Sequence, residues 1–315
     1  MKFLIKTLII LSIVFSINNS LIAVEIPYLL TASAKGDIET VKAIIESGGD
    51  PNTEDKDYVT ALMYAARKNQ IEVTKYLLSH GAKVNKTETD GWTALMYATK
   101  KNYTEIIKML LANGANPKIT DSDGWSAYGL AATSGFHKST ELLIQGGVDP
   151  NTRNSSGTTV SMLACKSGDA PTLDILVKNG ANLELKDKFG KSTLVYCVSN
   201  NQINATKYLI KQGVKIDSID KHGWTPLMWA VKKNHNEITK LLIKNNANIN
   251  HKDDEGTPLI HYAVYNGSID LIQFLINMNV NLKATDQYGL TPLVYALKSK
   301  NKEIISTIKA AGGKY

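Results

Sequence analysis

The sequence predicts an all-α solenoid of stacked helix-turn-helix units, because two residue types recur along it every 33 residues. The first is a glycine in an unbroken series: Gly91, Gly124, Gly157, Gly190, Gly223, Gly256 and Gly289. The second is a small residue in a fixed phase: Ala32, Ala65, Ala98, Ala131, Ala164, Cys197, Ala230, Ala263 and Ala296. A fixed period of this length indicates one structural unit repeated along the whole chain.

Each unit is expected to open with a short helix of about two turns. A hydroxyl side chain that can accept hydrogen bonds from the exposed N–H groups of the first turn precedes this helix at Thr60, Thr93, Ser126, Thr159, Ser192, Thr225 and Thr291. Pro226 and Pro292 follow two of these residues, in the first turn, where a missing N–H has little effect. Alanine at the repeated small position lets neighbouring helices approach closely.

A second helix follows in each unit and is too apolar to be stable alone, as in the runs Tyr76-Leu77-Leu78 and Leu241-Leu242-Ile243. Each unit therefore buries this surface on the next one. Residues that tolerate positive φ end the second helix: Gly48, Gly81, Gly114, Gly147, Gly180, Gly213, Asn246 and Asn279.

The units resemble the ankyrin repeat. Around Trp224 the chain is DKHGWTPLMWAVKKNHNEITKLLIKNNANIN, and around Trp92 it is TDGWTALMYATKKNYTEIIKMLLANGANPK. The resemblance covers about residues 25 to 315 and implies a fold of roughly nine repeats that binds other proteins through a concave face. It places a repeat domain at 24–315, with units near 24–56, 57–89, 90–122, 123–155, 156–188, 189–221, 222–254, 255–287 and 288–315.

Two units depart from the pattern. Unit 156–188 has Ser161 where most units have a large apolar residue, and Pro171 at the start of its second helix. We therefore expect the lowest local stability of the array in this unit. In the unit near Gly256, Thr257 and Pro258 come one residue early, which predicts a locally altered turn.

The N-terminal residues 1–23 have the layout of a secretory signal: Lys2 and Lys6, an apolar stretch, and a polar break. Cleavage is expected after Ala23, with Ser20 as the alternative. The stretch is short for a membrane span. We expect an exported bacterial protein, periplasmic or secreted; an uncleaved N-terminal membrane anchor is the alternative.

The charge of the chain is only modestly basic. Without Lys2 and Lys6 the formal net charge falls from +7 to +5. Arginine occurs only at Arg67 and Arg153, which argues against a phosphate-binding surface, and no aromatic groove with arginine for nucleic acid is visible. No nucleic acid is expected as a partner.

Cys165 and Cys197 are the two cysteines, 32 residues apart, on the first helices of adjacent units. Packed helices lie roughly 10 Å apart, whereas a disulfide requires α-carbons within about 7 Å. We therefore expect two free, buried thiols, although export would permit a disulfide.

Residues that could support catalysis are scattered. The histidines fall in different phases of different units: His80, His137, His222, His235, His251 and His261. Asp253, Asp254 and Glu255 cluster in a turn, which suggests either a cation site or, more simply, a solvated turn. No nucleophile elbow or phosphate-binding glycine loop is present. We expect no enzyme activity, catalytic residue, metal or cofactor.

The candidate site is a surface with aromatic side chains. Trp92, Trp125 and Trp224 stand at turn tips. On the first helix, an aromatic ladder consists of Tyr64, Tyr97, Tyr196, Trp229, Tyr262 and Tyr295, with a gap at Leu130 and Leu163. These rings either stack from unit to unit and stiffen the groove or anchor a partner, and the two roles are compatible.

Basic pairs end the first helix of several units: Arg67-Lys68, Lys100-Lys101 and Lys232-Lys233. Such lysines commonly form a solvated face. The alternative is that they steer an acidic partner toward the N-terminal half of the groove. We expect a scaffold or interaction module, monomeric when alone, that binds a protein partner. The alternative is a structural or protective accessory of an exported envelope enzyme.

Overall fold

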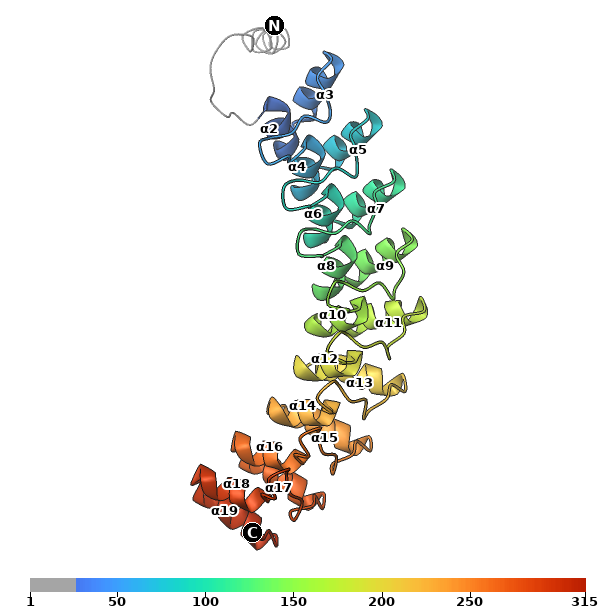
Figure 1. The fold of residues 1–315 in the computed structure, drawn as a ribbon. Coiled ribbons are helices and arrows are strands. Elements are labelled where there is room, and N and C mark those ends of the chain that lie inside the picture. The colour runs from blue at the N-terminus through green and yellow to red at the C-terminus, as the bar shows by residue number, and fades with distance from the viewer. Residues whose placement is uncertain (1–26) are drawn as a thin grey trace.

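The structure is a computed structural model that describes residues 27–315, so the expected signal segment lies outside the described residues. Its eighteen helices, α2 to α19, form consecutive pairs in a gently curved column (Figure 1). The first helices of the pairs are α2 (Tyr28–Lys35), α4 (Ala61–Arg67), α6 (Ala94–Lys100), α8 (Ala127–Thr133), α10 (Val160–Ser167), α12 (Thr193–Ser199), α14 (Pro226–Lys232), α16 (Leu259–Asn266) and α18 (Pro292–Ser299). The second helices are α3 (Ile38–Glu46), α5 (Ile71–Ser79), α7 (Thr104–Ala112), α9 (His137–Gln145), α11 (Ala170–Lys178), α13 (Ile203–Lys211), α15 (Asn236–Lys244), α17 (Ile269–Asn277) and α19 (Lys302–Ala310).

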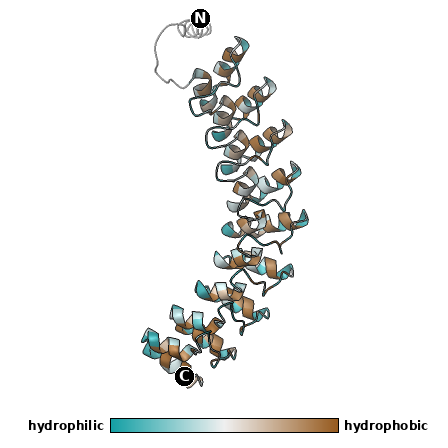
Figure 2. Cartoon of the chain, in the orientation of Figure 1, coloured by the Kyte–Doolittle hydropathy of each residue, from teal (hydrophilic) through white to brown (hydrophobic). Residues whose placement is uncertain are grey.

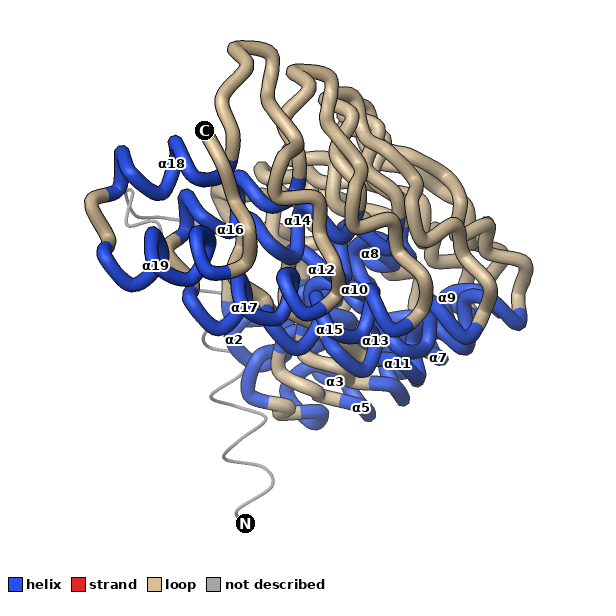
Figure 3. Tube along the Cα trace, turned by 90° about the horizontal axis from the view of Figure 1, so that it is seen from below, coloured by secondary structure: helices blue, strands red, loops and turns tan. Residues whose placement is uncertain are grey.

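The two sets of helices form two layers. The first helices lie along the concave side of the column and the second helices along the convex side (Figure 1). Seen from below, the loops between pairs project to one side of the helices as fingers (Figure 3). Residues 27–315 contain no strand, and isolated bridges such as Glu54 to Thr60 and Arg153 to Thr159 close the fingers. Nor does any helix in this range combine the length and apolar character that a membrane crossing requires.

The hydrophobic core runs continuously between the layers. Apolar residues recur in the helices along the whole column (Figure 2). The repeated small residues, for example Ala65 and Ala98, are completely buried, as are Leu77 and Leu110 of the second helices. Each unit therefore completes its core with side chains of its neighbours, as a solenoid requires.

The expected helix starts are largely confirmed. Six of the seven hydroxyl residues accept a hydrogen bond from the N–H three positions later: Thr60, Thr93, Ser126, Thr159, Ser192 and Thr225. Thr291 does not cap α18, because its hydroxyl donates to the Lys314 carbonyl at 2.7 Å. At the ends of second helices, Asn246 and Asn279 adopt positive φ, 68° and 58°, in place of the expected glycine.

The expectation of an altered turn near Gly256 is wrong. Asp253 Oδ1 accepts from the Thr257 N–H at 2.8 Å, the same bond that the other fingers make. The early Thr-Pro pair changes only the helix start, because Pro258 stands at the N-cap of α16 and offers no side-chain acceptor.

The prediction of two free thiols is also wrong, because Cys165 and Cys197 form a disulfide that joins α10 to α12. Their α-carbons are 4.5 Å apart. The spacing of about 10 Å applies to helix axes, whereas here the facing positions carry small residues and the backbones approach closely. Cys165 follows the small residue Ala164 of α10, and Cys197 is the small residue of α12, so the 32-residue offset aligns them.

Unit 156–188 packs without a visible defect. Pro171 stands in the first turn of α11, where Asp169 caps the helix, so the missing N–H breaks no hydrogen bond. Ser161 on α10 and Tyr128 on α8 occupy equivalent positions of adjacent units, and both are buried. The small Ser161 side chain thus stands one unit after the large Tyr128 ring at the same position. That this unit unfolds locally more easily than the others stays a prediction. The disulfide that joins it to the next unit argues against this prediction.

Candidate functional site: the concave face and its fingers

The aromatic ladder lies half-buried on the first helices, and five of its six members donate a hydrogen bond to a finger aspartate nine residues earlier. The bonded pairs are Tyr64 to Asp55 at 2.8 Å, Tyr196 to Asp187 at 2.9 Å, Trp229 Nε1 to Asp220 at 2.9 Å, Tyr295 to Asp286 at 2.7 Å, and Tyr262 to Asp253. Each bond connects a first helix to the finger that leads into it.

The same aspartates also fix the shape of the fingers. Asp187 Oδ1 accepts the backbone N–H groups of Phe189 and Lys191, both at 2.8 Å, while its Oδ2 accepts the Tyr196 hydroxyl. We call this arrangement of one aspartate, two finger N–H groups and one ladder side chain the finger lock. The structural role of the ladder is therefore to brace each finger against the helix that follows it, rather than mainly to stack rings from unit to unit.

The finger lock of the last unit shifts the pKa of both Tyr295 and Asp286. Burial, together with the hydrogen bond and the negative charge of Asp286, raises the pKa of Tyr295 to about 12. Burial opposes ionisation of Asp286, but the hydrogen bonds from Tyr295, Leu290 and Tyr288 outweigh it and lower the pKa of this carboxyl. The lock therefore holds a protonated phenol against an ionised carboxylate.

Tyr97 differs from the other ladder residues. The residue nine positions earlier is Glu88, whose carboxylate accepts the N–H groups of Asp90 and Trp92 but makes no hydrogen bond with the Tyr97 hydroxyl. Arg67 instead connects this unit to the previous one, with its guanidinium carbon 4.9 Å from the Tyr64 ring centre and 5.6 Å from that of Tyr97. A cation between two rings is a favourable arrangement.

The turn-tip tryptophans are half-buried and pack differently. Trp92 contacts Tyr97 with ring centres 5.1 Å apart, and Trp224 contacts Trp229 at 5.2 Å and, in the next unit, Tyr262 at 4.6 Å. These two tryptophans extend the ladder toward the fingers. Within residues 27–315 Trp125 has no aromatic neighbour, and the Lys166 ammonium lies 5.5 Å from its ring centre.

The predicted basic residues lie at the ends of the first helices. Lys68, Lys100, Lys101 and Lys233 are exposed, and Arg67 and Lys232 are half-buried. None of the six forms an ion pair within the described part of the chain.

Lysines on the second helices are paired more often. Four ion pairs lie within second helices: Lys42 with Glu39, Lys108 with Glu105, Lys178 with Asp174, and Lys240 with Glu237. Positive charge on the convex side is thus partly neutralised by the chain itself, whereas the cations predicted for the groove are not.

The exposed aromatic residues that the sequence analysis missed include Tyr58, Phe189 and Tyr288 at finger tips. They also include Tyr265, which lies in the last turn of α16 and is 71% exposed. The Lys232 ammonium is 4.9 Å from the Tyr265 ring centre. Tyr265 stands at the position in its unit that Arg67 has in an earlier unit, and Phe189 and Tyr288 stand at equivalent positions of their units. A comparison of all 33 positions across the units would therefore have identified these aromatic residues.

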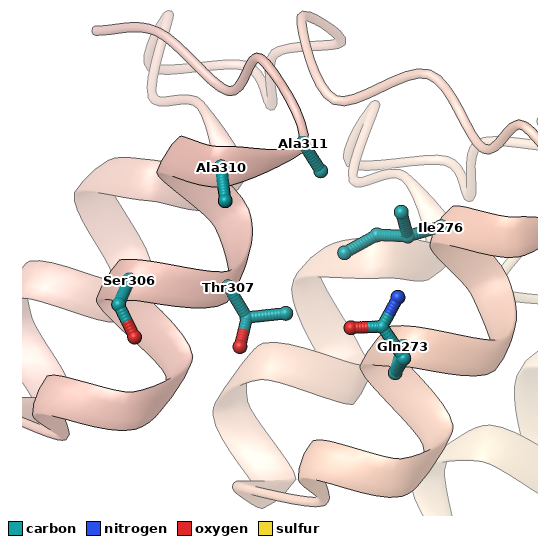
Figure 4. A pocket seen from close by; sticks show the side chains of 6 residues that line it. All are labelled: Gln273, Ile276, Ser306, Thr307, Ala310 and Ala311. Carbon is teal, nitrogen blue, oxygen red and sulfur yellow. The ribbon is translucent and has the colours of Figure 1, made fainter.

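A cavity of about 480 Å³ lies on the other side of the array, between α17 and α19. Figure 4 shows Gln273 and Ile276 facing Ser306, Thr307 and the alanines that follow. These residues provide amide, hydroxyl and apolar groups without a titratable side chain. Among residues 27–315, no group of three or more His, Cys, Asp or Glu side chains is arranged to hold a metal ion.

A curved stack of paired helices with projecting fingers and an open groove defines a repeat solenoid. A family model described as ankyrin repeats (3 copies) matches residues 29–121, 113–187, 161–253 and 246–313, so the chain belongs to the ankyrin-repeat family. Ankyrin repeats are generally protein–protein interaction modules.

The solved structures agree on the fold. The ankyrin repeat domain of Bcl-3, whose title calls it a unique member of the IkappaB protein family, is 24% identical to this chain. The match covers 70% of this chain and 99% of that one, with a TM-score of 0.62. No curated protein matches the sequence.

Proposed function

We propose that this chain is an exported, non-catalytic binding protein that holds an acidic partner protein in its concave face. The observation that supports this most directly is the set of six groove cations that form no ion pair with any described residue, beside a ladder of half-buried rings. Aromatic and arginine side chains are enriched at binding hot spots. Unpaired cations increase the association rate of an acidic partner and favour it over basic ones.

The finger lock supports binding by reducing the reorganisation that binding requires. Asp187 and Asp220 each hold two finger N–H groups and one ladder side chain, so fingers and helices keep one relative position before a partner arrives. A preorganised surface loses less conformational entropy on binding than a mobile one. The groove cations remain at exposed helix ends, where they can pair with carboxylates.

Export is proposed from two features of the chain. Residues 1–23 have the layout of a secretory signal. The disulfide between Cys165 and Cys197 fits an oxidising compartment, because cytosolic thiols are kept reduced in most organisms. Fractionation of native cells tests this, with mass spectrometry of the N-terminus in each fraction. A mature chain in the periplasm or medium would support export, and an uncleaved cytoplasmic chain would contradict it.

Charge reversal tests the proposed surface. Lys100→Glu with Lys101→Glu is expected to weaken binding of the partner by about tenfold or more, because two attractive charges become repulsive. Lys207→Glu with Lys211→Glu on α13 is the matched control, since it makes the same charge change with exposed residues of a second helix. The partner is captured by crosslinking in native cells and its affinity is then measured with both variants.

The salt dependence of the same affinity gives an independent test. Raising the ionic strength from about 0.01 M to 0.15 M shortens the screening length from about 30 Å to 8 Å. We expect weaker binding at the higher salt, and a smaller salt effect for the Lys100→Glu, Lys101→Glu variant than for the control. An affinity that is insensitive to salt, with equal losses in both variants, would exclude the basic groove as the binding surface.

A further inference from the structure

The gap in the aromatic ladder coincides with a second cavity, which has a volume of about 230 Å³. It lies between the finger that leads to α8 and the finger that leads to α10. Leu163 stands there in place of a ladder aromatic, and Gly129 takes the position that methionine occupies in four other units, for example Met96 and Met228. We call this cavity the interfinger slot.

Gly129 is the reason why the slot is open. A Cβ added to this residue would lie 3.4 Å from Leu163 Cδ1 and 3.4 Å from Trp125 Cε3, two side chains that also line the slot. The φ of Gly129 is not positive, so the backbone does not require glycine at this position. Glycine inside a helix is destabilising relative to other residues. Its presence here therefore calls for an explanation other than backbone geometry.

The lining of the slot combines an apolar interior with positive charge. Trp125, Val160 and Leu163 provide apolar surface, and Lys118 and Arg153 provide two cations. No carboxylate occurs among the described residues that line it. Within residues 27–315 the Arg153 side chain makes one hydrogen bond, a long one of 3.4 Å from Nη1 to the Lys186 carbonyl, so the guanidinium retains donors for a ligand.

The size and chemistry of the slot define its ligand. Pockets that enclose a whole small molecule usually measure about 300 to 1,000 Å³, so a cavity of 230 Å³ suits a single side chain. An indole wall favours a planar ring, and a guanidinium favours a carboxylate.

We infer that the interfinger slot receives an aromatic side chain of an acidic peptide segment, with a neighbouring carboxylate of that segment paired to Arg153. This inference rests on the proposed function and specifies what the partner must present. This explains why the ladder has no aromatic residue at Leu163, because the partner provides the aromatic ring at this position.

Gly129→Met tests the inference without disrupting the fold, because methionine is the residue of the equivalent position in other units. The probes are two synthetic peptides, acetyl-Gly-Glu-Phe-Glu-Gly-amide and the same peptide with Ala for Phe, titrated calorimetrically into the mature chain. Wild type is expected to bind the Phe peptide about tenfold more tightly than the Ala peptide, as one well-packed ring provides. Gly129→Met is expected to abolish that preference while its thermal unfolding midpoint stays equal or rises.

Arg153→Gln tests the carboxylate contact. A third peptide, acetyl-Gly-Gln-Phe-Gln-Gly-amide, replaces both Glu residues of the Phe peptide by Gln. Wild type is expected to bind the Glu-containing Phe peptide more tightly than this Gln peptide, and Arg153→Gln is expected to remove most of that preference while the preference for Phe over Ala remains. Equal binding of the Phe and Ala peptides to wild type, no binding of the Phe peptide, or an unchanged preference in Gly129→Met would each overturn the slot inference. These results leave the proposed function separately testable, because the Lys100→Glu, Lys101→Glu experiment uses the whole partner and a different part of the groove.

Discussion

The units with a finger lock and the central units 123–155 and 156–188 reach the same fold by different contacts. In the locked units a ladder ring joins helix to finger, as Tyr295 does with Asp286. In the central units Leu130 and Leu163 make no such bond, yet Asp121 still accepts the Trp125 N–H at 2.7 Å, and Asn154 accepts the Thr158 N–H at 2.9 Å. The finger turn is thus independent of the ring, and the ring adds the connection to the helix.

The largest effect is expected from the disulfide at the edge of the central region. Replacing both cysteines, Cys165→Ala with Cys197→Ala, should lower the free energy of unfolding by about 2–4 kcal/mol, because the unfolded chain loses a crosslink. Alanine is the appropriate replacement since it occurs at the equivalent positions of other units. Urea unfolding of wild type and variant measures the difference. Two free thiols in non-reducing mass spectrometry of the native protein would contradict the structure.

A smaller loss is expected at the carboxylate of a finger lock. Asp187→Ala removes the acceptor of two N–H groups and one hydroxyl, and should destabilise the protein by about 2–3 kcal/mol. Asn154→Ala, in the central region, removes the acceptor of two N–H groups and of the Ser156 hydroxyl. Because this acceptor is a neutral amide and no ladder ring is bonded to it, the variant should have about half that effect. Hydrogen exchange of the Lys191 and Thr158 amides locates each change. Equal losses of stability in both variants would mean that the hydrogen bond between the ring and the finger does not stabilise the fold.

A ladder hydroxyl alone should contribute about 1 kcal/mol. Tyr64→Phe removes the hydrogen bond to Asp55 and keeps the ring beside Arg67. Tyr97→Phe is the control, because Tyr97 also lies beside Arg67 but makes no hydrogen bond to a carboxylate in the described structure. The comparison uses urea unfolding midpoints. If both substitutions have the same effect, the lock bond does not stabilise the fold.

The smallest effect is a pH dependence at Tyr295. Its pKa is raised from 10.0 to about 12 in the folded state, so the stability it contributes is complete below about pH 10 and is lost as the pH rises through about 12. The difference in stability between wild type and Tyr295→Phe should therefore be constant up to pH 10 and disappear toward pH 12. Ultraviolet titration of tyrosinate in the two proteins checks the assignment. A group titrating near 10 at this position would contradict the lock.

The 33-residue period was sufficient to predict most of the fold, because capping hydroxyls and positive-φ residues each act within one unit. Thr60 and Asn246 illustrate this: their roles depend on local backbone geometry and were predicted correctly. The disulfide was not, since the distance between α10 and α12 depends on how closely small side chains let two backbones approach. The positions of residues within the 33-residue period do not give the distance between these two backbones.

The candidate site was only partly predictable for a similar reason. The phase placed the ladder and the basic pairs on the first helices, but it did not show that a ring such as Tyr196 bonds to Asp187 of the finger before its helix. That pairing depends on how the finger folds back against the helix. The interfinger slot exists because Gly129 has no side chain, and residues of the next unit complete its walls. Periodicity does not show such an opening.

The two kinds of crosslink also determine how the array can lengthen or shorten over evolution. A finger lock joins residues nine positions apart, and both positions recur with the 33-residue period, so duplication or deletion of 33 residues again places an aspartate nine positions before a ring at junctions between locked units. The bond between Cys165 and Cys197 joins two particular units, and losing either one leaves an unpaired thiol. We therefore expect units 156–188 and 189–221 to be gained or lost together more often than the other units.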